Sequence, residues 1–288
     1  MVYLRSKKVK GIEYVYLVRS LWDPKNSTSK QETIKYLGKA RDVTPSDIPD
    51  DYRNDPKVIA FLSSHNPIKS KTNERMQTKL QNEIFKKMSN GDLDNTVSLF
   101  ETFSKSSTLT EFYDKILKPV MYNIGDLWEK KKITTATEHI SSNVAHSLIK
   151  IINQKVSISN NKGKILICTP EGEWHNLGCN IIESVLLSKG YSVQNISPSL
   201  PHDSIINHIQ SIQPDAIVIS ITLKENVRSG QRLIQKIKMK KSPPVLIGGQ
   251  AVKVSKEEKF EALTMKEGTI DEMLKLLKSV MGKKRDRT

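Results

Sequence analysis

The sequence predicts a multidomain chain: a small basic β-rich module, a four-helix bundle, and an α/β domain built on a doubly wound parallel sheet of five strands. Three observations carry this prediction. Strand-like segments fill residues 1–40, helical periodicity dominates 73–155, and short apolar runs alternate with helices from residue 161 onward. We place the module and its linker at 1–72, the helical cap at 73–160 and the α/β domain, with a basic C-terminal tail, at 161–288.

The first 40 residues are rich in β-branched and aromatic side chains. "IEYVYLVRSLW" reads as a strand, "DPKNSTSK" has turn chemistry, and "QETIKYLG" resumes an extended pattern. We expect a β-hairpin or a three-stranded sheet. The next segment, 41–72, is rich in Pro, Asp, Ser and Asn, which indicates a linker, and "PKVIAFLSS" within it predicts one short helix.

Four helices are expected in the cap, and the breaks between them are short. They cover 73–89, 92–104, 109–128 and 134–154. The last carries an apolar stripe at steps of three or four that predicts packing on its neighbours; the stripe is Ala136, Ile140, Val144, Leu148 and Ile151. These lengths and breaks predict a four-helix bundle.

Continuous apolar strands alternate with helices in the last part of the chain. The strands are expected at 164–169, 191–197, 216–223, 244–250 and 262–265, and the helices at 175–190, 202–213, 225–238 and 269–281. This pattern is typical of a parallel doubly wound sheet, in which ligands bind beyond the carboxyl ends of the strands. The segment "TPEGEWHNLG", the pair Ser220 and Thr222, and the pair Gly248 and Gly249 all fall at such ends.

The net charge of the chain is +15, and residues 1–40 and 281–288 carry +6 and +3 of it. Clustered positive charge favours nucleic acid or acidic surfaces. The alternative is an ordinary solvated surface. Charge alone does not choose between them.

Several classes of protein are not indicated. There is no run of 18 apolar residues, and "MVYLRSKKVKG" has no apolar signal-peptide core, so we expect no membrane span. The only cysteines, Cys168 and Cys179, lie inside apolar segments, which favours a reducing cytoplasm and argues against a disulfide framework. No phosphate-binding loop, dinucleotide fingerprint or Ser-His-Asp arrangement is visible.

The segment "EGEWHNLG" follows the first strand of the predicted sheet. Glu173 lies two residues before His175 and can reach one imidazole nitrogen, which fixes the tautomer and leaves the other nitrogen to bind a metal. Gly178, on the first helical turn, allows a bulky ligand to approach the backbone. The alternative is a surface or capping histidine at a helix start.

Together these motifs resemble the cobalamin-binding domain shared by methionine synthases, mutases, corrinoid methyl carriers and some regulators. The family pattern is most often Asp-x-His-x-x-Gly, then Ser-x-Leu or Ser-x-Thr, then Gly-Gly. Here Glu173 stands in place of Asp, a variant associated with regulatory members.

The resemblance implies a flavodoxin-like fold and a cobalamin ligand. His175 would be the lower axial ligand of cobalt, steadied by Glu173. The nucleotide tail of the cofactor would enter a slot lined by small and hydroxylated residues: Gly178, Ser220, Thr222, Gly248 and Gly249.

A second resemblance lies in the helical part. "LWEKKKITTATEH" places nine residues between Trp128 and the pair Glu138 and His139, which resembles the signature of cobalamin-dependent light-sensing transcriptional repressors. The resemblance implies adenosylcobalamin rather than methylcobalamin, with these three residues lining its upper face. Light would cleave the cobalt–carbon bond, and the bundle would shift and change the oligomeric state.

Two departures from that family stand out. In one type of photoreceptor a histidine follows the tryptophan, but here the position is Glu129, so a bis-histidine light state would need another residue such as His139. No winged helix-turn-helix pattern is visible in 1–72. Within it, "KGIEYVYLVRSLWD" and "KQETIKYLGKA" weakly resemble the opening segment of some insertion-sequence transposases, without their acidic catalytic triad.

We therefore expect a cobalamin-binding sensor or regulator that is not an enzyme. Its output would be altered oligomerisation, or binding to nucleic acid or a protein partner, with DNA contacted through the basic N-terminal module. A hairpin that serves oligomerisation or a protein partner is the alternative for that module. For the whole chain the alternatives are a corrinoid methyl carrier of a methyltransferase system and a cobalamin storage or delivery module.

Overall fold

The structure is a computed structural model that describes residues 2–23, 28–65, 71–156, 162–240, 243–254 and 259–285. It divides into two compact units, Met1–Leu148 and Ile149–Thr288. Four predicted features fall outside the described residues: the centre of the first turn, part of the linker, the boundary at 160–161 and the end of the basic tail. No described helix is long and apolar enough to cross a membrane.

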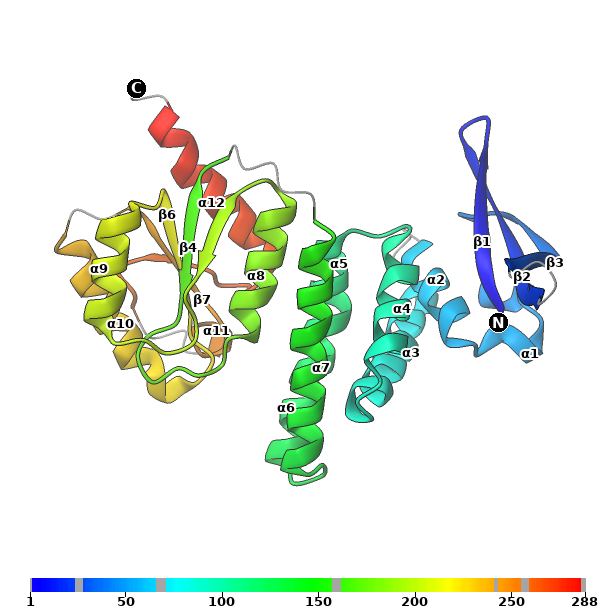
Figure 1. Cartoon of the computed structure of the whole chain (residues 1–288), viewed down its shortest axis with the longest axis horizontal. Coiled ribbons are helices and arrows are strands. Elements are labelled where there is room, and N and C mark those ends of the chain that lie inside the picture. The colour runs from blue at the N-terminus through cyan, green and yellow to red at the C-terminus, as the bar shows by residue number, and fades with distance from the viewer. Residues whose placement is uncertain are drawn as a thin grey trace. The chain divides into compact units, whose positions relative to one another are not determined.

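The N-terminal module is a three-stranded antiparallel sheet (Figure 1), which confirms the second of the two β arrangements expected. Its strands are β1 (Val2–Val9), β2 (Ile12–Asp23) and β3 (Thr28–Lys39). Lys10 and Gly11 join the first two strands, with φ of 48° and 83°. Two successive positive φ values define the hairpin turn whose twist matches that of the flanking strands, and glycine adopts one of them without strain.

One face of this sheet packs on the helices that follow. These are the 3₁₀ turn η1 (Pro45–Asp47), α1 (Asp50–Arg53) and α2 (Pro56–His65). The shared core contains Leu4, Val15, Leu17, Val43, Ile48, Val58, Phe61 and Met76. Alternation along the strands explains the pattern, because every second residue of a strand points to the same face.

The helical region continues with helices close to the expected ranges. They are α3 (Lys71–Ser89), α4 (Leu93–Ser104), α5 (Leu109–Phe112), α6 (Lys118–Glu129) and α7 (Thr135–Gln154). A single helix was expected over 109–128, but a π-helical turn, η2 (Tyr113–Leu117), separates α5 from α6.

Pro119 follows this π-helical turn, and a neighbouring helix compensates for the backbone hydrogen bond that the proline removes. Proline has no backbone N–H and therefore leaves the carbonyl four residues earlier without its helical donor. That carbonyl belongs to Lys115, and it accepts a hydrogen bond from Gln81 Nε2 of α3 at 2.8 Å. A side chain from a neighbouring helix thus satisfies the group that the proline leaves unpaired.

The stripe expected on α7 is only partly correct. Val144 and Leu148 are buried as expected, but Ala136 is exposed and Ile140 is 43% exposed. Burial begins at Ser141, because the first turns of α7 form the end of the α6–α7 hairpin rather than part of the packed core (Figure 1). Periodicity identified the buried side of the helix but not where its burial starts.

The second unit contains the predicted five-stranded parallel sheet. Its strands are β4 (Lys164–Cys168), β5 (Ser192–Asn195), β6 (Ala216–Ser220), β7 (Val245–Gly248) and β8 (Leu263–Thr264). They are arranged in the order β5-β4-β6-β7-β8, and all four pairs are parallel. This is the flavodoxin-like order, in which the chain reverses direction across the sheet between the first and third strands.

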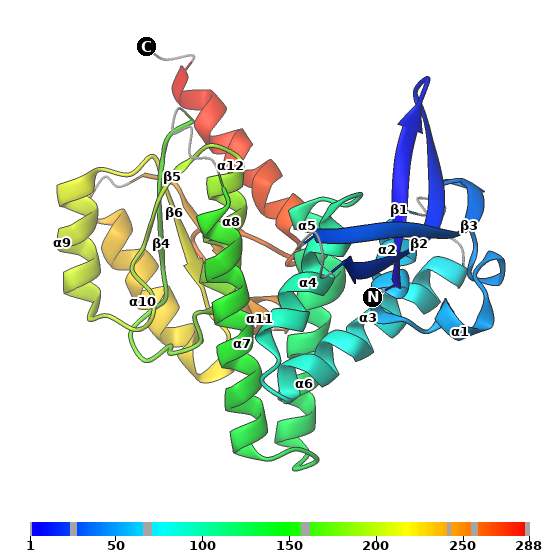
Figure 2. The same cartoon turned by 45° about the vertical axis from the view of Figure 1, so that its right-hand side comes forward.

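Helices cover both faces of this sheet. The long helices are α8 (Leu177–Ser188), α9 (His202–Ile212), α10 (Val227–Lys238) and α12 (Ile270–Arg285). Figures 1 and 2 show α8 and α12 on one face and α9 and α10 on the other. A short helix that was not expected, α11 (Gln250–Val254), follows β7. The reversal point therefore lies between β4 and β6, where the loop leaving β4 carries His175.

Candidate functional site

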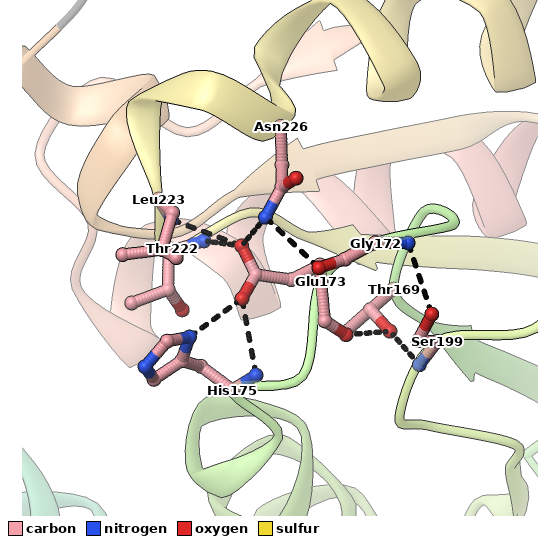
Figure 3. Close-up of polar contacts among 8 residues, drawn as sticks. All are labelled: Thr169, Gly172, Glu173, His175, Ser199, Thr222, Leu223 and Asn226. Carbon is pink, nitrogen blue, oxygen red and sulfur yellow. Dashed lines mark hydrogen bonds and ion pairs between the residues drawn. The ribbon is translucent and has the colours of Figure 1, made fainter.

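The loop that leaves β4 is held in a defined shape by its own backbone and by the neighbouring loop. Thr169 is buried, and its hydroxyl donates to the carbonyl of Glu173 at 3.0 Å. The same hydroxyl accepts from the backbone N–H of Ser199 at 2.9 Å. Gly172 has φ of +92°, a conformation that side chains rarely adopt, and its N–H donates to Ser199 Oγ (Figure 3). These contacts fix the position from which the Glu173 side chain projects.

The carboxylate of Glu173 is fully buried and accepts five hydrogen bonds. Oε1 accepts from the backbone N–H of His175 at 3.0 Å and lies 2.8 Å from its Nδ1. Oε2 accepts from the backbone N–H groups of Thr222 and Leu223, each at 2.9 Å, and from Asn226 Nδ2 at 3.0 Å. Figure 3 shows the carboxylate between the two loops. It ties the loop after β4 to the loop after β6.

These contacts keep Glu173 ionised. Burial acts to raise the pKa of its carboxyl group, but hydrogen bonds from His175, Leu223 and Asn226 outweigh burial and lower the pKa to about 2. An ionised carboxylate has no proton to donate, so the hydrogen in the contact with His175 Nδ1 comes from the imidazole. In its neutral form the imidazole is therefore protonated on Nδ1, and Nε2 carries the lone pair.

His175 is placed to present that nitrogen outside the loop. Its side chain is 54% exposed, although the carboxylate beside it is completely buried. A histidine whose Nδ1–H is held by a carboxylate has a fixed ring orientation and a more basic Nε2, which is how proteins prepare imidazole as a metal ligand. The contact between Glu173 and the imidazole that the spacing predicts is present. Binding of cobalt by His175 remains a prediction.

Small residues line the carboxyl ends of the neighbouring strands. A Cβ added to Gly178, at the start of α8, would lie 3.4 Å from Ser220 Oγ. Ser220 pairs in register with Gly248, and the next residue, Gly249, has φ of +110°. A Cβ at Gly249 would approach the Ile221 carbonyl oxygen to 2.2 Å, so only glycine fits there. The structure thus places all five residues of the predicted slot at one edge of the sheet. Thr222 is held there because its backbone N–H donates to the Glu173 carboxylate.

This arrangement fits a cobalamin cofactor by the chemistry of its donors. A neutral, oriented imidazole beside an anchored carboxylate suits a transition-metal ion with an open axial position. Glycines and a hydroxyl beside it leave the backbone open to a bulky ligand. Among the described residues, no cluster of three or more His, Cys, Asp or Glu side chains is placed to hold a metal ion by itself. The donor set offers one imidazole nitrogen, and a metal already held in a macrocycle would need no further ligand from the protein.

The other predicted cofactor residues belong to the unit Met1–Leu148. Trp128 lies in the last turn of α6, is 47% exposed, and donates from Nε1 to the hydroxyl of Thr135 at the start of α7 at 3.2 Å. One turn further along α7, Glu138 Oε2 lies 2.6 Å from His139 Nδ1 and Oε1 accepts from the Ser142 hydroxyl at 2.7 Å. The three residues therefore share the end of the α6–α7 hairpin. Their role toward a cofactor remains a prediction.

Sequence reasoning missed the groups that anchor Glu173 on its far side, although Thr222 itself was predicted as a cofactor-binding residue. Two of its donors are backbone N–H groups, at Thr222 and Leu223, and these leave no trace in residue type. Asn226 ends the 3₁₀ turn after β6, η3 (Lys224–Asn226), and is the N-cap of α10, where a polar side chain is common. The one available signal for these donors was that a buried carboxylate needs several hydrogen bonds. The loop after a neighbouring parallel strand can supply them.

Comparison with protein families agrees with this geometry. Residues 163–273 match a family described as a B12 binding domain, and residues 80–153 match a second B12 binding domain family. The first match covers the α/β unit from β4 into α12. The second covers α3 from its middle through to the end of α7.

Individual relatives are distant. Over 143 residues, 49% of this chain, the sequence is 21% identical to the HTH-type transcriptional repressor CarH of Myxococcus xanthus, and this match spans about half (48%) of the repressor. It is 20% identical over 196 residues to dimethylamine corrinoid protein 2 of Methanosarcina acetivorans, covering 66% of this chain and 91% of that protein. A solved monomethylamine corrinoid protein from Methanosarcina barkeri shares the fold, with a TM-score of 0.58 and 15% identity over 68% of this chain and 96% of its own.

Proposed function

We propose that this chain, a cobalamin-binding protein with a B12-binding domain and a B12-binding helical region, is a sensor or regulator that uses adenosylcobalamin and responds to light. Its output is a change in oligomerisation or in binding to nucleic acid or a protein partner, rather than catalysis. When bound, the cofactor would supply a cobalt–carbon bond that light can break.

Each part of the site has a distinct task in this proposal. Nε2 of His175 would hold the cobalt, and the buried carboxylate of Glu173 holds the imidazole in the required tautomer. The glycines and hydroxyls at the carboxyl ends of β6 and β7 admit the nucleotide tail. Because Glu173 also accepts from the loop after β6, its carboxylate links His175 to that loop.

The residues at the end of the α6–α7 hairpin favour a sensor over the other candidates. Trp128 is a large half-exposed indole whose N–H is satisfied within the hairpin, so its apolar ring is available to cover a ligand. Glu138 and His139 place a hydrogen-bonded polar pair one turn from it. An aromatic cap beside polar groups suits an adenosyl group, which has a flat base and ribose hydroxyls.

A corrinoid methyl carrier is the second candidate, because the similarity to dimethylamine corrinoid protein 2 extends over nearly all of that protein. A methyl carrier must leave the upper face of its cofactor open to partner enzymes. An indole that covers this face works against methyl transfer, so the role of Trp128 separates the two candidates.

Illumination provides the direct test of the proposed function. The full-length protein is loaded with adenosylcobalamin in the dark and exposed to green light, while absorption spectra and the oligomeric state are recorded. We expect the absorption spectrum to change faster than that of the free cofactor at the same light dose, and the oligomeric state to change with it. Loading with methylcobalamin and adding a methyl acceptor thiol is the matched arm for the carrier. Photochemistry no faster than that of free cofactor, or an unchanged oligomeric state, contradicts the sensor.

Replacing Trp128 by alanine is expected to weaken adenosylcobalamin about tenfold while leaving methylcobalamin within about twofold. An aromatic contact on a ligand base is worth roughly 1 kcal/mol beyond its buried area, and a methyl group offers no such contact. Trp22→Ala, in the N-terminal sheet, is the control because that indole is also exposed. Equal weakening of both cobalamins by Trp128→Ala would show that the indole does not recognise the adenosyl group.

A further inference from the structure

The N-terminal sheet has one face that points away from the core shared with the helices, and on it Val18, which pairs with Tyr3, is buried. Register places Tyr3, Arg5 and Lys7 of β1 beside β2, with Arg5 opposite Tyr16. On the other side of β2, Tyr16 pairs with Tyr36 and Tyr14 with Lys39. We call this surface the aromatic face and define it by seven residues: Tyr3, Arg5, Lys7, Tyr14, Tyr16, Tyr36 and Lys39.

The side chains of the aromatic face are organised by contacts with one another. The ring centroids of Tyr16 and Tyr36 lie 5.1 Å apart, and those of Tyr14 and Tyr36 lie 6.3 Å apart. Gln31 donates to the Tyr3 hydroxyl at 2.6 Å and accepts from the Arg5 guanidinium. Tyr36 is nevertheless 53% exposed. The result is an ordered, partly exposed aromatic surface rather than a set of independent side chains.

Charge is distributed unequally between the two faces of this sheet. The three acidic residues of the strands are Glu13, Asp23 and Glu32. Glu13 and Asp23 stand at odd-numbered positions of β2, whereas Tyr14 and Tyr16 stand at even-numbered positions. The two carboxylates therefore point away from the aromatic face. Glu32 pairs with Arg19, which donates to Tyr52 of α1 on the helix-facing side. Among the described strand residues, the aromatic face therefore carries cations and no carboxylate.

The shape of the hairpin suits a groove. β1 and β2 pair along all eight residues of β1 and end in the tight turn at Lys10 and Gly11 (Figure 2). Lys7, Lys8 and Lys10 are exposed near this turn. The major groove of DNA is wide enough for a two-stranded β-ribbon, and lysines on such a ribbon face phosphates on both walls.

We propose that the aromatic face binds double-stranded DNA. Arg5, Lys7 and Lys39 neutralise backbone phosphates, and the tyrosines pack against sugars and base edges and donate hydrogen bonds from their hydroxyls. The absence of carboxylates on this face distinguishes a phosphate partner from a protein surface of mixed charge. The inference rests on the proposed function in naming double-stranded DNA among its possible outputs, and it does not depend on which cobalamin is bound.

Fluorescence anisotropy of the full-length protein with a labelled 30-base-pair duplex of mixed sequence tests the proposal. Binding is measured over a series of salt concentrations, with a single strand of the same length and with poly-glutamate as competitor. Lys7→Glu/Lys39→Glu reverses two charges on the aromatic face, and Tyr36→Ala removes the most exposed of its rings. Lys30→Glu is the matched control, because Lys30 is exposed in the same sheet and pairs with Leu21 on the alternate positions.

We expect the double variant to bind the duplex at least about tenfold more weakly and to lower the slope of log K against log salt by about two, since each lost phosphate contact removes about one unit. Tyr36→Ala should weaken binding several-fold, with Tyr36→Phe in between, and Lys30→Glu should stay within about twofold. Equal effects of Lys30→Glu and the double variant, tighter binding to the single strand, or full competition by poly-glutamate would each overturn the proposal. Unchanged cobalamin spectra in these variants, together with DNA binding retained in His175→Ala, keep this result separate from the proposed sensor function.

Discussion

Replacing His175 by alanine is expected to abolish coordination of cobalt by the protein while leaving the fold intact. The imidazole is half-exposed, so its removal creates no cavity in the core, and the buried Glu173 keeps four of its five hydrogen-bond donors. The absorption spectrum of the loaded variant should lose the features of a histidine-bound cobalamin. We also expect at least about tenfold weaker binding, the range seen when a residue that supports a metal centre is lost.

Isotope labelling makes this prediction specific to a histidine nitrogen. Electron paramagnetic resonance of the Co(II) form reports the nuclear spin of the axial nitrogen. Protein prepared with ¹⁵N-histidine should show splitting from ¹⁵N if His175 is bound, and from ¹⁴N if the cofactor keeps its own benzimidazole. His208→Ala is the matched control, because His208 is an exposed histidine of the same unit that contacts Gln194. A ¹⁴N pattern in the wild-type protein would exclude the proposed ligand.

The fold could be predicted where burial is continuous along an element. β6 is the plainest case, because all five of its residues, Ala216–Ser220, are buried, as expected for the central strand of a parallel sheet. Strands of this kind, separated by helices of similar length, also predict the doubly wound arrangement. The exact start of burial along α7 could not be predicted, since it depends on where neighbouring helices end and not on the sequence of α7.

The sequence allowed the side-chain contacts of the candidate site to be predicted, but not its backbone hydrogen bonds. The spacing of Glu173 and His175 predicts their contact, because both lie on one short loop. The second anchor of Glu173 comes from backbone N–H groups about 50 residues later, at Thr222 and Leu223. Every non-proline residue carries such a group, so only the folded sheet shows which ones converge. The interruption at Tyr113–Leu117 is similar, because its compensation by Gln81 depends on a neighbouring helix.

Replacing Glu173 by glutamine is expected to destabilise the α/β unit by about 3 kcal/mol in the cobalamin-free protein. The carboxylate accepts five hydrogen bonds while fully buried, and an amide of the same shape offers one acceptor oxygen and introduces a donor facing other donors. The depressed pKa gives a similar magnitude. A fall from the ordinary value of 4.5 to about 2 corresponds to about 3 kcal/mol, at about 1.4 kcal/mol for each pKa unit.

The pH dependence of this effect has a definite sign. Because the pKa of Glu173 is lower in the folded protein, its stabilising contribution is fully present above about pH 4.5 and is lost as pH falls toward about 2. The difference in unfolding free energy between the wild type and Glu173→Gln should therefore be largest near pH 6 and shrink as the pH is lowered to 3. Urea titrations followed by circular dichroism at several pH values measure this difference.

Glu225→Gln provides the matched control for Glu173→Gln. Glu225 is exposed in the turn that also contains Asn226, so the same change there should alter the unfolding free energy by less than about 0.5 kcal/mol at every pH. If Glu173→Gln costs no more than this control, the carboxylate does not hold the two loops together. His175 would then lack the fixed orientation on which its role as a cobalt ligand depends.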